Sequence, residues 1–253
     1  MQKKPISYGL YIIDKLDTLV GFFLINEKPT SSKDPFALRR SAIGLLRTII
    51  ENNLTVGLRD LIDYLIKFYT EQGVKDVNKN THLELINFFR DRMKNILKEK
   101  RVRPDIIEAS LSSHTNDNFL ELYKKTLVMN KFISKDLGKN AVSTYKRAYN
   151  IIDREKNISK SGPDAVLFKQ DEEKELFDKI NDIRKAFTYK ERKESYENHL
   201  KLLSDAKLST DKFFDNVKVN DENNDIKNNR LELLQRLCST FNTFIDFSKL
   251  EGS

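Results

Sequence analysis

Residues 38–49, LRRSAIGLLRTI, determine the class of fold, because their apolar side chains recur at intervals of three or four positions. The apolar stripe consists of Leu38, Ala42, Leu45, Leu46 and Ile49. These positions fall on one side of a helix with about 3.6 residues per turn, which is typical of an amphipathic α-helix packed on a core. Just ahead of the stripe, Asp34 suits an N-cap and Pro35 the first helical position, so we expect the helix to begin there.

The same spacing returns along most of the chain. Further stripes run from Leu58 to Tyr69, from Ile86 to Leu97, from Leu176 to Phe187 and from Leu234 to Ile245. Alternating strand patterns are nearly absent, and Val217 with Val219 is the only short candidate. The sequence therefore predicts an all-α fold, an antiparallel helical bundle. We expect Phe213, Phe214, Phe241 and Phe244 to fill its core.

A chain of 253 residues is long enough for one or two domains. A polar stretch at residues 75–80 follows Gly73 and interrupts the helical pattern. We therefore expect a boundary that divides the chain into residues 1–79 and 80–253.

Charge is distributed unevenly. The whole chain carries 45 basic and 38 acidic side chains, a formal net charge of +7. Residues 90–160 hold 17 basic and nine acidic side chains, a net charge of +8, whereas residues 164–225 hold 12 and 16, a net charge of −4. Within the basic stretch, Lys94, Lys98 and Arg101 are expected to line one flank of a helix, where they suit phosphate groups. A solvated face that only keeps the protein soluble explains the same residues.

Groups for autonomous catalysis are sparse. The histidines, His82, His114 and His199, stand far apart without metal-ligand spacing, and we expect each at the surface. No glycine-rich phosphate loop occurs in the sequence. The single cysteine, Cys238, continues an apolar stripe, so it is expected in the core and indicates a reducing cytoplasm. No apolar run is long enough for a membrane span.

Several segments together resemble a known family. They are DKLDTLVG at 14–21, EKPT at 27–30, SKDPFALRR at 32–40, KRAYNI at 146–151, FFDNVKV at 213–219, NRLELL at 229–234 and DFSKL at 246–250. The chain resembles, over nearly its whole length, the C-terminal part of the β subunit of the bacterial two-subunit glycyl-tRNA synthetase. Residues 80–253 resemble its helical anticodon-binding domain, which is of the DALR-like kind found in arginyl-tRNA synthetase. Residues 1–79 resemble the remnant of an HD-like helical domain.

The resemblance implies a division of labour between chains. In the family, the β subunit binds tRNA, and a separate α subunit holds the aminoacylation site and uses ATP and Mg²⁺. This chain is therefore expected to need no cofactor of its own. Its expected partners are tRNA(Gly), the α subunit and the missing N-terminal part of the β subunit. The family's HD histidines do not occur here, so Asp14 is not expected to complete a metal site. Asn26 and Ser31 stand where the family usually shows glycine.

An RNA-binding role would place its contacts on the helix around KRAYNI. Tyr145, Lys146, Arg147 and Asn150 offer aromatic, cationic and amide groups within two helical turns, and such groups read unpaired bases. Spacing of i, i+4 puts Lys146 and Asn150 on one face. In the alternative interpretation, Tyr145 belongs to the core and Asn150 bonds a neighbouring carbonyl.

Arg230 is a further candidate for RNA contact, although an ion pair with an acidic residue such as Asp215 fits it as well. Three functions remain consistent with the sequence. The first is the anticodon-recognising part of glycine–tRNA ligase, without catalysis of its own. The second is a helical scaffold or vestigial fragment that contacts only other synthetase chains. The third is a vestigial HD-type phosphohydrolase, which would need histidine ligands from another chain.

Overall fold

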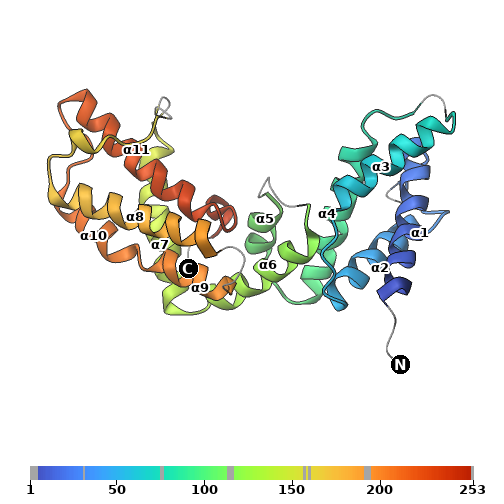
Figure 1. Ribbon diagram of the computed structural model, residues 1–253. Coiled ribbons are helices and arrows are strands. Elements are labelled where there is room, and N and C mark those ends of the chain that lie inside the picture. Colours follow the sequence, from blue (N-terminus) through green and yellow to red (C-terminus); the bar gives the residue numbers. More distant parts are fainter. Residues whose placement is uncertain are drawn as a thin grey trace. The chain divides into compact units, whose positions relative to one another are not determined.

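The computed structural model describes residues 5–30, 32–74, 77–112, 117–155, 158, 161–190 and 195–251, and this part of the chain is helical without any β-strand (Figure 1). The predicted all-α class is confirmed, and Val217 and Val219 form no strand. Among the helices of this part, none combines the length and apolar character that a bilayer crossing requires.

The chain forms two compact units, which comprise residues 1–102 with 114–124 and residues 103–113 with 125–253. This division differs from the boundary expected between residues 79 and 80. Helix α4 (Thr81–Glu99) packs against α1, α2 and α3, so it belongs to the first unit. The polarity of the preceding stretch marks a connection between helices of one unit. The assignment of residues 1–79 to an HD-like remnant stays a prediction.

The first unit is built from α1 (Pro5–Leu24), α2 (Leu38–Glu51), α3 (Leu58–Glu71) and α4, with the beginning of α6 (Phe119–Ile133). The apolar stripe of α2 is buried, as predicted from its spacing. The start of α2 differs from the prediction, because the helix begins at Leu38 and Pro35 lies in a turn before it. Asp34 nevertheless caps the helix, since its carboxylate accepts the backbone N–H groups of Leu38 (2.8 Å) and Arg39 (3.1 Å).

Helices α1 to α4 end in the same backbone motif, with a residue in the left-handed conformation two positions after the helix. These residues are Asn26, Asn53, Gly73 and Arg101. After α4, the N–H of Val102 donates to the carbonyl of Leu97 (3.2 Å) and the N–H of Arg101 to that of Lys98 (2.9 Å), which is a Schellman motif. Glycine and asparagine adopt this conformation readily, whereas the Cβ of arginine opposes it.

The second unit contains α5 (Pro104–Ser112), the rest of α6, α7 (Asp136–Ile152), α8 (Asp171–Lys190), α9 (Tyr196–Ser204), α10 (Lys207–Asn216), α11 (Asn224–Phe241) and the 3₁₀ turns η1 (Ala165–Leu167) and η2 (Phe247–Lys249). Helix α7 packs against α11, and α8 against α10, around one apolar core (Figure 1).

Most of the predicted core of this unit is buried, including Cys238, Phe213, Phe241 and Phe244. Phe214 departs from the prediction, because it is only half-buried.

Candidate nucleic-acid interface

Helix α7 has one buried and one solvent-facing side. The buried residues are Gly138, Ala141, Val142, Thr144, Tyr145 and Ala148. On the opposite side, Lys139, Ser143, Arg147 and Asn150 are exposed and Lys146 is partly exposed, and we call these five residues the α7 polar face. Successive residues of a helix turn by about 100°, so this spacing gathers the five side chains on one side of α7.

Lys146 and Asn150 lie on this face as predicted by their spacing. Within the described residues, neither side chain makes a hydrogen bond or ion pair with the rest of the chain. The ammonium group of Lys146 and the amide of Asn150 are therefore available to a ligand. Lys139 and Ser143 belong to the same face and were not among the predicted residues. Ser143 comes three positions before Lys146 and four before Arg147, and Lys139 comes four before Ser143, so helical spacing would have identified both.

Arg147 is also on the α7 polar face, but its guanidinium is held by α10. It lies 3.4 Å from a carboxylate oxygen of both Asp211 and Asp215. Its central carbon lies 4.5 Å from the ring centroid of Phe214, which accounts for the half-burial of that ring. The side chain keeps 46% of its surface exposed. Arg147 thus joins α7 to α10 while nearly half of its side chain remains exposed.

Tyr145 lies in the core, which corrects its prediction as an RNA contact. Its ring stacks on Tyr149 and packs against Phe241 and Phe247, with centroids 5.5–5.9 Å apart. Its hydroxyl accepts a hydrogen bond from Nδ2 of Asn242 (3.3 Å), and burial raises the pKa of this hydroxyl well above its usual range. A buried ring cannot stack on a base.

Arg230 is likewise internal, so its prediction as an RNA contact is wrong. Its side chain is 4% exposed and forms ion pairs of 2.8 Å with Glu173 and with Asp221, whereas Asp215 was the expected partner. Glu173 also accepts the backbone N–H groups of Lys169 (2.7 Å) and Gln170 (2.8 Å) ahead of α8. The arginine therefore neutralises a buried carboxylate that caps a helix.

The three residues predicted to form a basic flank lie in the first unit. Lys94 and Lys98 are on α4, where Lys98 is exposed and Lys94 partly exposed. Arg101 is exposed too, but it follows the end of the helix, with φ at 57°. The flank thus consists of two helical lysines and one arginine in a turn, and the α7 polar face belongs to the other unit.

The part of the chain that the structure describes contains no group of three or more His, Cys, Asp or Glu side chains that could hold a metal ion. Asp14 pairs with Lys15 at 2.9 Å. His82 is mostly buried and its Nδ1 bonds the carboxylate of Asp63. His199 is buried against the ring of Phe187, so the expected surface position is wrong for it. His114 lies outside the described residues.

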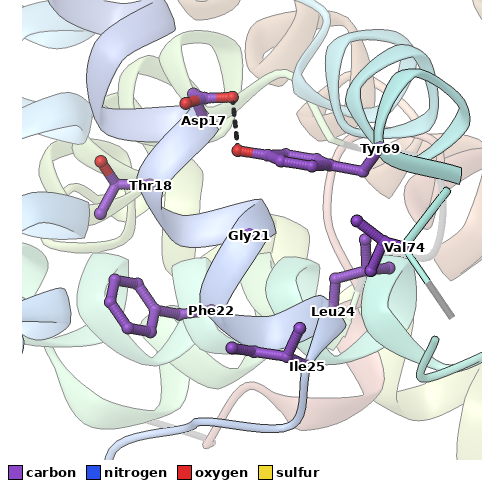
Figure 2. A pocket seen from close by; sticks show the side chains of 8 residues that line it. All are labelled: Asp17, Thr18, Gly21, Phe22, Leu24, Ile25, Tyr69 and Val74. Atoms are coloured by element: carbon purple, nitrogen blue, oxygen red, sulfur yellow. Dashed lines mark hydrogen bonds between the residues drawn. The ribbon is translucent and has the colours of Figure 1, made fainter. Parts of the chain in front are cut away.

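A mainly apolar pocket of about 330 Å³ occurs in the first unit. Its walls are formed by Asp17, Thr18, Gly21, Phe22, Leu24, Ile25, Tyr69 and Val74. Figure 2 shows the carboxylate of Asp17 meeting the hydroxyl of Tyr69, which donates to it over 2.9 Å. Burial, together with the hydrogen bond to Asp17, raises the pKa of the Tyr69 hydroxyl. The hydroxyl of Thr18 donates to the backbone carbonyl of Asp14, so the polar groups of this pocket are satisfied within the fold.

Comparison with known proteins adds two family matches. Residues 1–112 match the profile of the glycyl-tRNA synthetase β subunit, and residues 141–249 match the DALR anticodon binding domain. The second match begins within α7 and contains Lys146, Arg147 and Asn150. The helical second unit is therefore of the DALR kind.

Curated relatives agree with both matches. The glycine–tRNA ligase β subunit of Rhodospirillum centenum is 36% identical over an alignment of 253 positions, which covers 98% of this chain and 35% of the relative. That of Rickettsia africae is 38% identical over 241 residues, which are 95% of this chain and 34% of the relative. The chain thus spans about a third of the length of the curated relatives it matches. Taken with the two matched profiles, this places the chain in the glycyl-tRNA synthetase β subunit family, where it corresponds to the C-terminal part.

Proposed function

We propose that this chain is the tRNA-binding, anticodon-recognising part of a glycine–tRNA ligase β subunit, and that it supports glycyl-tRNA synthesis catalysed by a separate α subunit. One observation in the second unit supports the proposal. The match to the DALR anticodon binding domain contains the exposed part of α7 on which Lys146 and Asn150 have no partner within the described residues.

Each side chain of this part of α7 suits a different feature of an anticodon loop. The ammonium of Lys146 neutralises a backbone phosphate and contributes affinity without sequence discrimination. The amide of Asn150 both donates and accepts, as hydrogen bonding to the edge of an unpaired base requires. The guanidinium of Arg147 is held over Phe214 by two carboxylates, so its outer plane is preorganised for stacking on a base.

The remaining components of the reaction belong to other chains in this proposal. The α subunit supplies the aminoacylation site and uses ATP and Mg²⁺, and the N-terminal part of the β subunit completes the enzyme. The chain itself acts in the cytoplasm without a cofactor. Its role is to position tRNA(Gly) for a reaction that it does not catalyse.

Binding of a labelled tRNA(Gly) transcript, followed by fluorescence anisotropy, tests the proposal. We expect the affinity to fall with increasing salt, because lysine–phosphate contacts release counterions. Lys146→Ala is expected to reduce the slope of log K against log salt by about 1. Asn150→Ala is expected to weaken binding about 2- to 10-fold, the effect of one lost hydrogen bond.

The matched control is Lys174→Ala, which removes an exposed lysine of α8 from the same unit. It changes the net charge as Lys146→Ala does, and it is expected to leave binding nearly unchanged. Equal losses in the two lysine variants would remove the assignment to α7. Absence of any tRNA binding would favour a scaffold that contacts only other synthetase chains.

A further inference from the structure

The outer side of the first turns of α1 is apolar and uncovered. Ile6, Leu10 and Ile13 are 73%, 67% and 44% exposed. Their spacing of i, i+4 and i+7 places them on one side of the helix, and we call them the α1 apolar stripe. In Figure 1 these turns are the dark blue start of α1.

The opposite side of the same turns already belongs to the core. Ile12 and Leu16 are buried. Tyr11 keeps 38% of its surface exposed, but its hydroxyl lies so close to α2 that a Cβ added to Gly44 would be 2.5 Å from the hydroxyl oxygen. Residues 6–13 contain no charged side chain, so this part of α1 turns no charged side to water. A helix of this kind is normally enclosed by protein on both sides, since an amphipathic surface helix turns a polar side to water.

The length of the relatives indicates what covers the stripe. The chain corresponds to 35% of the Rhodospirillum centenum β subunit, and the remainder of that subunit comes before the matched part. The family match covers residues 1–112, and α1 is its first helix, so α1 follows the remainder most directly along the sequence of the relative. The absence of charge in residues 6–13 favours a protein surface over RNA, whose phosphates require basic side chains.

We propose that the α1 apolar stripe is the docking surface for the N-terminal part of the glycyl-tRNA synthetase β subunit. The stripe packs into an apolar groove of that part and thereby joins the first unit to the rest of the β subunit. This proposal rests on the family membership of the chain and is independent of tRNA binding by the second unit.

Cysteine accessibility tests the proposal. Leu10→Cys places a thiol in the stripe, and Leu83→Cys is the matched control, because Leu83 is also an exposed leucine of the first unit, at 60%. Cys238 is buried and does not compete for a maleimide reagent. Each variant is measured as the chain alone and as a chimera, in which it replaces the matching C-terminal third of the Rhodospirillum centenum β subunit.

We expect the thiol introduced by Leu10→Cys to react rapidly in the chain alone and at least about tenfold more slowly in the chimera. The thiol introduced by Leu83→Cys should react at the same rate in both. Adding the separate N-terminal part of the same subunit should slow the reaction likewise, and Leu10→Asp should prevent its co-elution with the chain. Equal reaction rates of the Leu10→Cys thiol in the chain and the chimera would overturn the proposal.

Protection that increases with the concentration of the chain alone would overturn it too, because the stripe would then bind a second copy. Binding of tRNA(Gly) by Leu10→Asp reports separately on the proposed function.

Discussion

At the scale of single residues, two arginines of the second unit have opposite environments. Arg230 is enclosed and neutralises Glu173, which is fully buried and also caps α8. Arg147 lies half in solvent and pairs with Asp211, which is partly exposed, and with Asp215, which is exposed. Removing one partner of a buried pair leaves an uncompensated charge, whereas an exposed pair is screened by water.

Arg230→Ala is therefore expected to lower the free energy of unfolding by about 3–5 kcal/mol. Arg147→Ala should lower it by about 1 kcal/mol or less, because its ion pairs are partly exposed. Urea unfolding of the two variants, followed by circular dichroism, measures the difference. Similar stabilities would contradict the internal role of Arg230.

The thiol of Cys238 gives a second prediction at this scale. Burial raises its pKa from 9.0 to about 12. Well below pH 9 the thiol is protonated in both the folded and the unfolded chain, so its contribution to stability is complete there. As the pH rises from 9 towards 12, the unfolded chain loses this proton and the folded chain keeps it, so the free energy of unfolding falls.

Replacing the thiol isolates its contribution from those of other groups that titrate in this range. The free energy of unfolding of Cys238→Ala should fall less steeply between pH 8.5 and pH 10.5 than that of the unchanged chain. The difference between the two slopes should be on the order of that expected for one titrating group. Urea unfolding at a series of pH values provides the slopes. Parallel slopes for the two proteins would show that the thiol does not titrate on unfolding.

At the scale of elements, the ends of α1 to α4 share one motif but not one residue type. Asparagine or glycine occupies the left-handed position after α1, α2 and α3, and Arg101 occupies it after α4. The same arginine was predicted to contact RNA, and such a role would explain why a less suitable residue stands there.

Arg101→Gly should raise the free energy of unfolding by about 0.5–1 kcal/mol, because glycine relieves the left-handed strain and loses part of this gain to chain entropy. Asn26→Gly is the control and should be close to neutral, because asparagine already tolerates this conformation. Thermal unfolding of both variants compares the two effects. A loss of stability in Arg101→Gly would mean that the arginine side chain contributes more than its backbone strain costs.

Sequence periodicity predicts these elements well and their partners poorly. The stripe of α2 and the solvent-facing position of Lys146 and Asn150 follow from spacing along one helix. The burial of Arg230 depends on Glu173, which is 57 positions away, and a local pattern contains no signal for such a pair. The burial of Tyr145 is not contained in the spacing either, because spacing shows which residues share a side of α7 and does not show that this side faces α11.

At the scale of the whole chain, the boundaries of the two units could not be predicted from the sequence. A polar stretch before α4 resembles a domain linker, whereas the packing of α4 on α1, α2 and α3 is set by contacts between distant segments. The basic stretch from residue 90 to residue 160 is divided between the two units in the same way, so its side chains do not all belong to one unit. It contributes Lys98 to the first unit and Lys146 to the second.

Binding of the anticodon end of tRNA(Gly) by α7 of the second unit is the central proposal for this chain. Hydroxyl-radical footprinting of tRNA(Gly) with the full chain tests this binding directly, because it maps the nucleotides that the chain protects. We expect protection of the anticodon loop, lost in the double variant Lys146→Ala and Asn150→Ala and retained in Lys174→Ala. Protection confined to the acceptor stem, or an anticodon footprint that survives in the double variant, would contradict this function of α7.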